Sequence, residues 1–264
     1  MNILNKKVYN IASLSILIYV VLMLAASISL IFVFDFPDIL REPVEVMLAK
    51  FNSNSGLVVP SYYLFVLSGI SFIFMTLLIH KTIVPRDSIL GFLAVVSGVL
   101  FGLLSNLGFI RWPFLMKYLS GVIADPALTE TGKETVKLIF NSFHTYSGVA
   151  VGENFAFWFE GFWVLFISGV IKMRKDVFPE YLSSLGFVIG AGMLVYTLEQ
   201  FGGIFATLGV MNMIIHAGFL VWLCAVSILI YRFQANKNYM PVLGNTAGAL
   251  LIVFYAVLLI TSYA

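Results

Sequence analysis

Charged residues are scarce in this sequence. Asp, Glu, Lys and Arg make up 11% of the 264 residues, whereas about a quarter of a soluble domain is charged. The shortage excludes a water-soluble globular protein and a disordered chain. A net charge of +2 gives no indication of nucleic acid or another anionic partner. The single cysteine, Cys224, excludes an intramolecular disulfide.

Familiar catalytic and cofactor-binding motifs are also missing. The sequence has no HExxH, no paired cysteines and no GxSxG turn. No predicted span carries a mid-membrane lysine for a Schiff base, which excludes retinal. The three histidines, His80, His144 and His216, are expected at different depths, so a bis-histidine haem is not expected either. The sequence therefore assigns no cofactor.

Long apolar runs dominate the chain instead. Hydrophobic residues make up 61% of it, and the mean hydropathy is +1.01. Because a bilayer core takes roughly 20 helical residues, the runs predict an all-α, multi-pass bundle of about seven spans in one domain, residues 1–264. The expected spans are Ile11–Phe34, Leu57–Ile79, Ile89–Ile110, Val149–Ile171, Tyr181–Phe201, Ile204–Tyr231 and Val242–Tyr263.

The distribution of Lys and Arg favours a cytoplasmic N-terminus and an outer C-terminus. Two longer outer loops, residues 35–56 and 113–147, are then expected to carry short amphipathic helices. One helix should begin at Pro43 and the other at Asp125-Pro126. The second helix is either a solvated connector or a lid over a cavity.

Small residues recur at a spacing that allows helices to approach closely. The pairs are Gly98/Gly102, Gly148/Gly152, Gly186/Gly190 and Gly244/Gly248. They predict tight packing within the chain and leave a homo-oligomer open. Gly202-Gly203 predicts a very short turn between the fifth and sixth spans. Trp112 and Tyr118 are expected as anchors at the membrane interface.

Three carboxylates fall within the predicted spans, namely Glu153, Glu160 and Glu199. An ionisable group inside the bilayer costs several kcal/mol unless it is paired, hydrated or neutral, so these positions indicate a site. Glu153 and Glu160 are seven residues apart, which places them on one stripe of a helix, about 20° apart around its axis.

Arg111, Asn154 and His216 complete the candidate ligand- or ion-binding set, which is expected in the outer half of the bundle. Arg111 is a natural counter-ion for Glu153 or Glu199, in either a structural ion pair or a hydrated cavity. Glu160 has no obvious partner at its depth, which favours a functional role. His144 is expected to be solvated.

Three segments resemble a bacterial family of multi-pass membrane proteins described only as a domain of unknown function. They are Gly108–Pro113 (GFIRWP), Phe143–Glu153 and Leu198-Glu199. The resemblance covers the third to fifth spans and implies a multi-pass protein of a bacterial inner membrane. It carries no catalytic or binding roles.

Three functions remain open. A transporter-like or ligand-binding bundle is preferred, with a carboxylate and arginine site for a small molecule or cation. The alternatives are an accessory or sensory subunit with a structural Arg–Glu network, and an intramembrane enzyme using a buried Glu. One version of the enzyme holds a metal through Glu153, Glu199 and His216. The lipid bilayer is an expected partner in every case, and nucleic acid in none.

Overall fold

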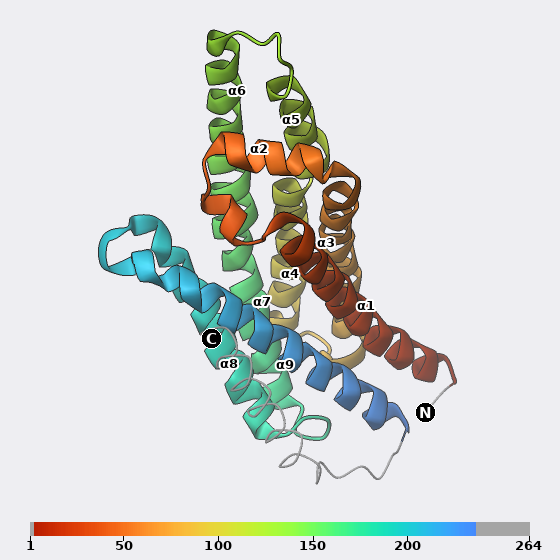
Figure 1. Cartoon of the computed structure of the whole chain (residues 1–264). Coiled ribbons are helices and arrows are strands. Elements are labelled where there is room, and N and C mark those ends of the chain that lie inside the picture. Colours follow the sequence, from red (N-terminus) through yellow and green to blue (C-terminus); the bar gives the residue numbers. More distant parts are fainter. Residues whose placement is uncertain (1–2, 236–264) are drawn as a thin grey trace. The chain divides into compact units, whose positions relative to one another are not determined.

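A computed structural model describes residues 3–235 of the chain (Figure 1), and every regular element within them is helical. The elements are α1 (Ile3–Phe34), η1 (Asp38–Arg41), α2 (Val44–Ser53), α3 (Ser55–Ile83), α4 (Ile89–Phe109), η2 (Trp112–Met116), α5 (Lys117–Ile123), α6 (Glu130–Phe143), η3 (His144–Phe155), α7 (Ala156–Met173), α8 (Glu180–Tyr196), η4 (Thr197–Phe201), η5 (Gly203–Leu208) and α9 (Gly209–Ala235). Of the η elements, η2 and η3 are π-helices and the others are 3₁₀-helices.

Six helical stretches are long and apolar enough to cross a membrane, which confirms an all-α, multi-pass membrane protein. They are Lys6–Phe34, Ser55–Ile83, Ile89–Ile123, Glu130–Met173, Glu180–Phe201 and Met211–Phe233. The expected seventh span, Val242–Tyr263, lies outside the described residues. The third and fourth stretches are longer than predicted because further helical segments, η2 and α5 in the third and α6 in the fourth, extend each of them.

The chain divides into two compact units. Unit 1 comprises residues 1–20, 71–101 and 157–264, and unit 2 comprises residues 21–70 and 102–156. The division falls within α1, α3 and α4 and at the start of α7. Each unit is built from segments that are distant in the sequence, and each has its own aromatic core.

The core of unit 2 is organised around Trp112. Its ring stacks on Tyr62 at 4.7 Å and on Phe51 at 6.0 Å, and it meets Phe34 edge-on at 5.5 Å. The indole is 2% exposed. The prediction that Trp112 anchors the interface is therefore wrong, because its ring is enclosed by aromatic side chains of α1, α2, α3 and α6. Tyr118 is 68% exposed, as an interface residue would be.

The predicted outer loops of unit 2 are mostly helical. The helix expected after Pro43 is α2, which begins at Val44 and packs against α5 and α6. The second begins at Glu130 rather than at Asp125-Pro126, because the Thr129 hydroxyl caps α6 by accepting a hydrogen bond from the Gly132 amide. Residues 113–147 thus form a helical hairpin instead of a loop.

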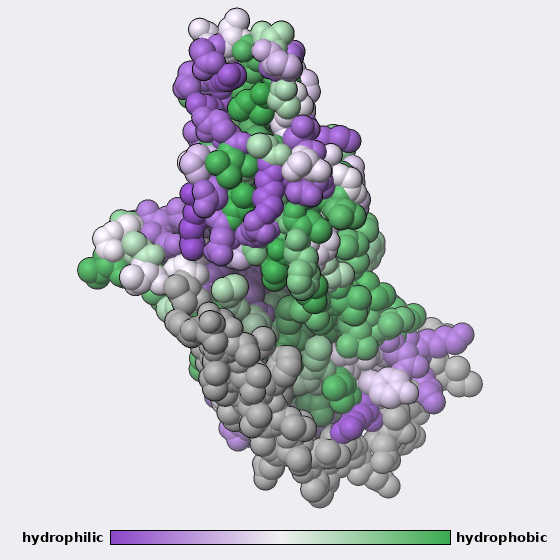
Figure 2. Space-filling view, viewed as in Figure 1, coloured by the Kyte–Doolittle hydropathy of each residue, from purple (hydrophilic) through white to green (hydrophobic). Residues whose placement is uncertain are grey.

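The amphipathic face predicted for this hairpin is only partly buried. Val136 and Phe140 lie in the core of unit 2, whereas Ile139 and Phe143 are exposed. Hydrophilic side chains cover much of the visible surface of α6 (Figure 2), and Lys137 of α6 pairs with Glu45 of α2. The pair joins two helices of the same unit at their polar surface.

The core of unit 1 contains Phe72, Trp163, Phe219 and Trp222. The Phe72 and Trp163 rings meet at 4.8 Å, and the Trp222 indole donates a hydrogen bond to the Leu182 carbonyl, which joins α9 to α8. Gly186 of α8 faces the Trp222 ring so closely that an added methyl group would lie 3.0 Å from it. This glycine of the Gly186/Gly190 pair therefore serves packing within the chain.

The connection between α8 and α9 is longer than the short turn expected. Gly202 and Gly203 do turn the chain, with φ of +67° and +58°, conformations that favour glycine. Gly202 lies between two 3₁₀-helices, however, and Gly203 begins the second of them, so α9 begins only at Gly209. The helices α8 and α9 are packed neighbours, as predicted.

The central position of Trp112 predicts a large loss of stability when the indole is removed. Trp112→Ala is expected to destabilise the protein by about 3–5 kcal/mol, the range for truncating a large buried aromatic side chain. The measurement is thermal unfolding of the purified protein in mild detergent. Tyr118→Ala is the control, because its ring is mostly exposed. Equal melting temperatures for the two variants would contradict this account of the core.

The Glu45–Lys137 pair predicts a small stability term that depends on pH. The hydrogen bond from Lys137 lowers the pKa of Glu45 below 4.5. The stabilisation is therefore present above that pH and is lost as the pH falls through the folded-state pKa. Because Glu45 is well solvated, Glu45→Gln should cost at most about 0.5 kcal/mol at neutral pH and nothing in acid. Melting curves against pH test this, with the exposed Glu42→Gln as control.

Candidate functional site

Glu160 of α7 is the one carboxylate among the described residues that the fold buries completely, with 0% exposure. Its Oε2 lies 3.0 Å from Nε2 of His216, which comes from α9. The expectation that Glu160 has no partner at its depth is therefore wrong. Both residues belong to unit 1.

The hydrogen bonds of His216 fix where its protons are. Nδ1 lies 2.9 Å from the Asn212 carbonyl oxygen, and a carbonyl can only accept. Nδ1 therefore carries a hydrogen, and Nε2 is either the bare nitrogen of a neutral ring or the second N–H of an imidazolium. In the first state Glu160 must be a carboxylic acid that donates to Nε2, and in the second it is a carboxylate that accepts. One proton is shared between Nε2 and Oε2 in both states, and the pair carries no net charge.

The surroundings of this pair are aromatic and short of polar partners. The His216 ring lies 4.7 Å from the Phe157 ring, which also contacts Tyr196. The second oxygen of Glu160, Oε1, is buried without a hydrogen-bond partner, and so is the hydroxyl of Tyr19. Tyr19 is close enough to interact electrostatically with Glu160. Most buried polar groups in proteins are hydrogen-bonded, so these two are exceptions that need an explanation.

Tyr19 was not predicted as a site residue. The sequence feature that could have revealed it is its position: Tyr19 lies in the middle of the first apolar run, away from the two interface levels where tyrosine is common. Two more unpartnered polar atoms lie in the same unit, Oγ1 of Thr76 and Nε1 of Trp163. Trp163 follows Glu160 by three residues on α7, which places the two side chains on one face of that helix.

Glu199 occupies a different setting within unit 1. It lies in η4, and its carboxylate is directed at Gly209, the first residue of α9. A negative charge at a helix N-terminus is stabilised by the helix dipole. This position suits a capping role for Glu199.

Arg111, Glu153 and Asn154 belong to unit 2. The guanidinium of Arg111 donates to the Gly108 carbonyl, lies against Gly148 and sits 5.4 Å from the centre of the Trp112 ring. Glu153 is near enough to Arg111 to act on it electrostatically, and the expected ion pair between the two stays a prediction. Glycine at 148 is required here, because any side chain would collide with the guanidinium.

Two π-helices flank Arg111. The segment η2 follows it directly, and η3, twelve residues long, carries Glu153 and Asn154. Such helices are rare and occur frequently at functional sites. Nε of Arg111, the Tyr62 hydroxyl and Nδ1 of His144 are buried there without partners. The prediction that His144 is solvated is therefore wrong, since its ring also stacks on Phe140 at 5.5 Å.

The structure thus joins Glu160 to His216 in unit 1, and it places Arg111 within electrostatic range of Glu153 in unit 2. The single pocket expected for all six residues stays a prediction. Within residues 3–235, no group of three His, Cys, Asp or Glu side chains is arranged to hold a metal ion. The expected trio of Glu153, Glu199 and His216 is therefore not found as a metal site among these residues.

The fold and this site define a multi-pass α-helical membrane protein with a buried carboxylate–histidine pair in its core. The chain belongs to the family described as a domain of unknown function (DUF4386), which matches residues 11–227. The match confirms the resemblance to a family without an assigned activity, and it extends well beyond the third to fifth spans. A search of curated proteins and a search of solved structures found no match.

The Glu160–His216 pair predicts an asymmetric double-mutant cycle. His216→Ala leaves a buried carboxyl without its partner and should cost about 3–5 kcal/mol. Glu160→Gln should cost less, because the amide N–H can still donate to Nε2. Adding Glu160→Gln to His216→Ala should then restore part of the lost stability. Additive melting-temperature losses in the double variant would show that the two side chains do not share a proton.

Proposed function

We propose that the protein is a transporter-like, proton-coupled protein of a bacterial inner membrane, in which the Glu160–His216 pair binds the coupling proton. The observation that carries the proposal is the 3.0 Å hydrogen bond between these two ionisable groups inside a largely apolar and aromatic core. Ionisable side chains within membrane spans are costly, and they mark proton relays and substrate paths.

A proton fits this pair better than a metal cation does. Glu160 has no exposed surface, so a hydrated cation cannot reach its oxygens unless the packing opens. A proton needs no cavity, because it passes along the hydrogen bond that already joins Oε2 to Nε2. The side chain of His216 is 21% exposed, which makes this ring the group through which the pair exchanges protons.

Release of the shared proton changes the forces within the core. A neutral ring with hydrogen on Nδ1 presents a lone pair at Nε2, and an ionised Glu160 presents a second lone pair opposite it. The two acceptors repel each other, and the pair carries a buried charge of −1. Burying an unpaired charge is strongly unfavourable, so deprotonation favours a different arrangement of α7 against α9.

The unpartnered atoms of unit 1 support such a second arrangement. Oε1 of Glu160 and the Tyr19 hydroxyl are unsatisfied in the packing observed. A state that admits water or a polar ligand to these atoms would supply the missing hydrogen bonds. Proton binding and ligand access would then alternate, which is the coupling that a transporter requires.

A second function is favoured by the surroundings of Arg111. Its guanidinium lies against Gly148 and beside the buried Trp112 ring, in the centre of the packing of unit 2. That placement suits a structural Arg–Glu network, as in an accessory or sensory subunit. This role requires no proton movement at Glu160, so a pH-jump measurement distinguishes it from the proton-coupled function.

The proposed function predicts charge movement when the pH changes suddenly. Protein reconstituted in liposomes on a solid-supported membrane should give a transient current after a pH jump, without any organic substrate. Glu160→Gln should abolish the current, because glutamine cannot bind the coupling proton. Glu134→Gln is the matched control, since Glu134 is an exposed carboxylate on α6, and it should leave the current unchanged.

Two results would reject the proton-coupled function. A current that survives Glu160→Gln at full size would assign proton binding to other groups. A wild-type protein that is folded and reconstituted but gives no current would favour the structural alternative. Melting curves of each variant before reconstitution exclude misfolding as the cause of a lost signal.

A further inference from the structure

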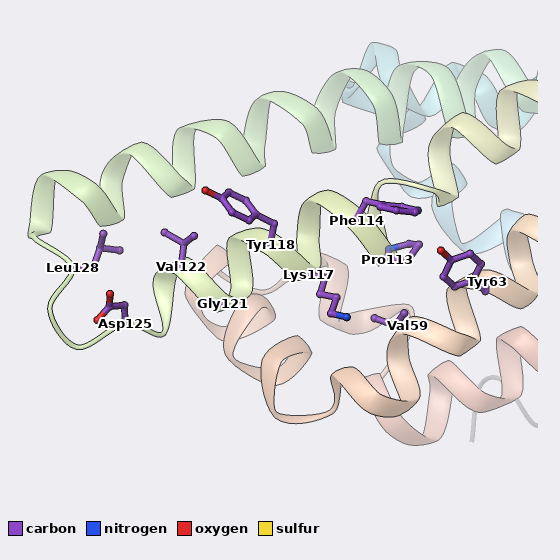
Figure 3. A pocket seen from close by; sticks show the side chains of 10 residues that line it. All are labelled: Val59, Tyr63, Pro113, Phe114, Lys117, Tyr118, Gly121, Val122, Asp125 and Leu128. Atoms are coloured by element: carbon purple, nitrogen blue, oxygen red, sulfur yellow. The ribbon is translucent and has the colours of Figure 1, made fainter.

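A groove of about 750 Å³ lies in unit 2, between the start of α3 and the helical path formed by η2 and α5 (Figure 3). Its lining is mostly apolar and aromatic. Tyr63 and Phe114 form an edge-to-face pair with ring centres 6.3 Å apart, and Phe114 is 60% exposed. Lys117 extends its ammonium group towards Val59 across the groove (Figure 3).

Lys117 differs from the other lysines of unit 2. Lys50 pairs with Asp35, Lys133 with Glu130, and Lys137 with Glu45 and Glu134. Among the described residues, no carboxylate lies within ion-pair distance of Lys117. The groove contains one acidic residue, Asp125, which lies at its far end beside Leu128 (Figure 3). Asp125 is eight residues beyond Lys117, about 12 Å along a helical path.

The length of the helix places Lys117 at the level of the lipid headgroups. The helical path from Ile89 to Ile123 has 35 residues, and roughly 20 of them suffice for the bilayer core. Counted from Ile89, the core ends near Ile110, and Lys117 lies about 10 Å further along. Headgroups and interface occupy roughly 5–8 Å on each side of the core, so the backbone of Lys117 lies just beyond their layer, and its long side chain can return the amino group to it.

Tyr63 gives the depth of the apolar end of the groove independently. It precedes Ile83, the end of α3, by about 20 residues, the length of helix that the bilayer core takes. The Tyr63–Phe114 pair therefore lies at the boundary between acyl chains and headgroups, where aromatic side chains are common. The groove thus has an apolar end at the hydrocarbon boundary and an unpaired cation in the headgroup layer.

We propose that this groove binds a single anionic phospholipid, with its phosphate on Lys117 and the start of an acyl chain against Tyr63 and Phe114. The charge and the apolar surface are arranged in the order in which a phospholipid presents its phosphate and its chains. Asp125 lies too far along the groove to neutralise Lys117, and a net negative lipid supplies the missing charge. The proposal is independent of proton binding at Glu160.

Native mass spectrometry of protein extracted from mixed vesicles tests the proposal. The vesicles contain equal amounts of phosphatidylglycerol and phosphatidylcholine. The wild-type protein should retain phosphatidylglycerol in preference, and Lys117→Gln should weaken that preference about fivefold, the loss expected for one basic residue near an anionic lipid. Lys117→Arg keeps the charge and should retain the preference. Lys133→Gln, which removes an exposed and already paired lysine, should also retain it.

Each contrary outcome overturns the inference. Equal retention of the two lipids by the wild-type protein would show that the groove does not select a negative headgroup. An equal loss in Lys117→Gln and Lys133→Gln would show that only the overall charge matters. A dimer whose formation depends on Phe114, with no bound lipid, would show that a second copy of the chain covers the groove. None of these results bears on the pH-jump current, so the two proposals fail separately.

Discussion

Placing a charge inside a bilayer costs several kcal/mol, and this constraint accounts for most of the polar architecture of the protein. Glu160, with no exposed surface, is held by His216 in a pair that is neutral as long as it keeps one proton. Arg111 is enclosed by a glycine and an indole and lies within range of Glu153. The lysines and carboxylates of the hairpin lie at the surface, where their ion pairs stay in solvent.

The two buried polar groups differ in the type of helix that holds them. Glu160 lies in regular α-helix, and its partner comes from another helix of the same unit. Arg111 immediately precedes the π-helix η2, and Glu153 lies within the π-helix η3, so both stand where the backbone departs from the regular α-helical pattern. Both groups contain buried polar atoms without hydrogen-bond partners, which are exceptions among buried polar groups.

Apolar run lengths predicted the class of fold and most of the spans, because the bilayer imposes a minimum length on every crossing helix. They did not predict the hairpin. Pro113 and Lys117 interrupt the apolar run before α5, and α6 is rich in charged and polar residues, so a hydropathy reading assigns this segment to a loop. Glu160 was found from sequence because an acid is conspicuous among apolar residues. Its contact with His216 was not predicted. The periodicity of a sequence gives the positions of side chains around their own helix axis, but not which residues of another helix face them. Trp112 was misplaced for a related reason: composition cannot distinguish an indole at the bilayer surface from one enclosed by neighbouring helices.

The depth of the Glu160–His216 pair has an electrical consequence. Glu160 precedes Met173, the end of α7, by 13 residues, which is about 20 Å of helix and some two-thirds of the hydrocarbon thickness. A proton that reaches the pair from either side of the membrane therefore crosses part of the transmembrane potential, which acts on a full crossing with about 2.3 kcal/mol per 100 mV. Under the proposed proton-coupled function, occupancy of the pair would depend on voltage as well as on proton concentration. A cell that energises its membrane would then change the protonation of this core without any change in external acidity.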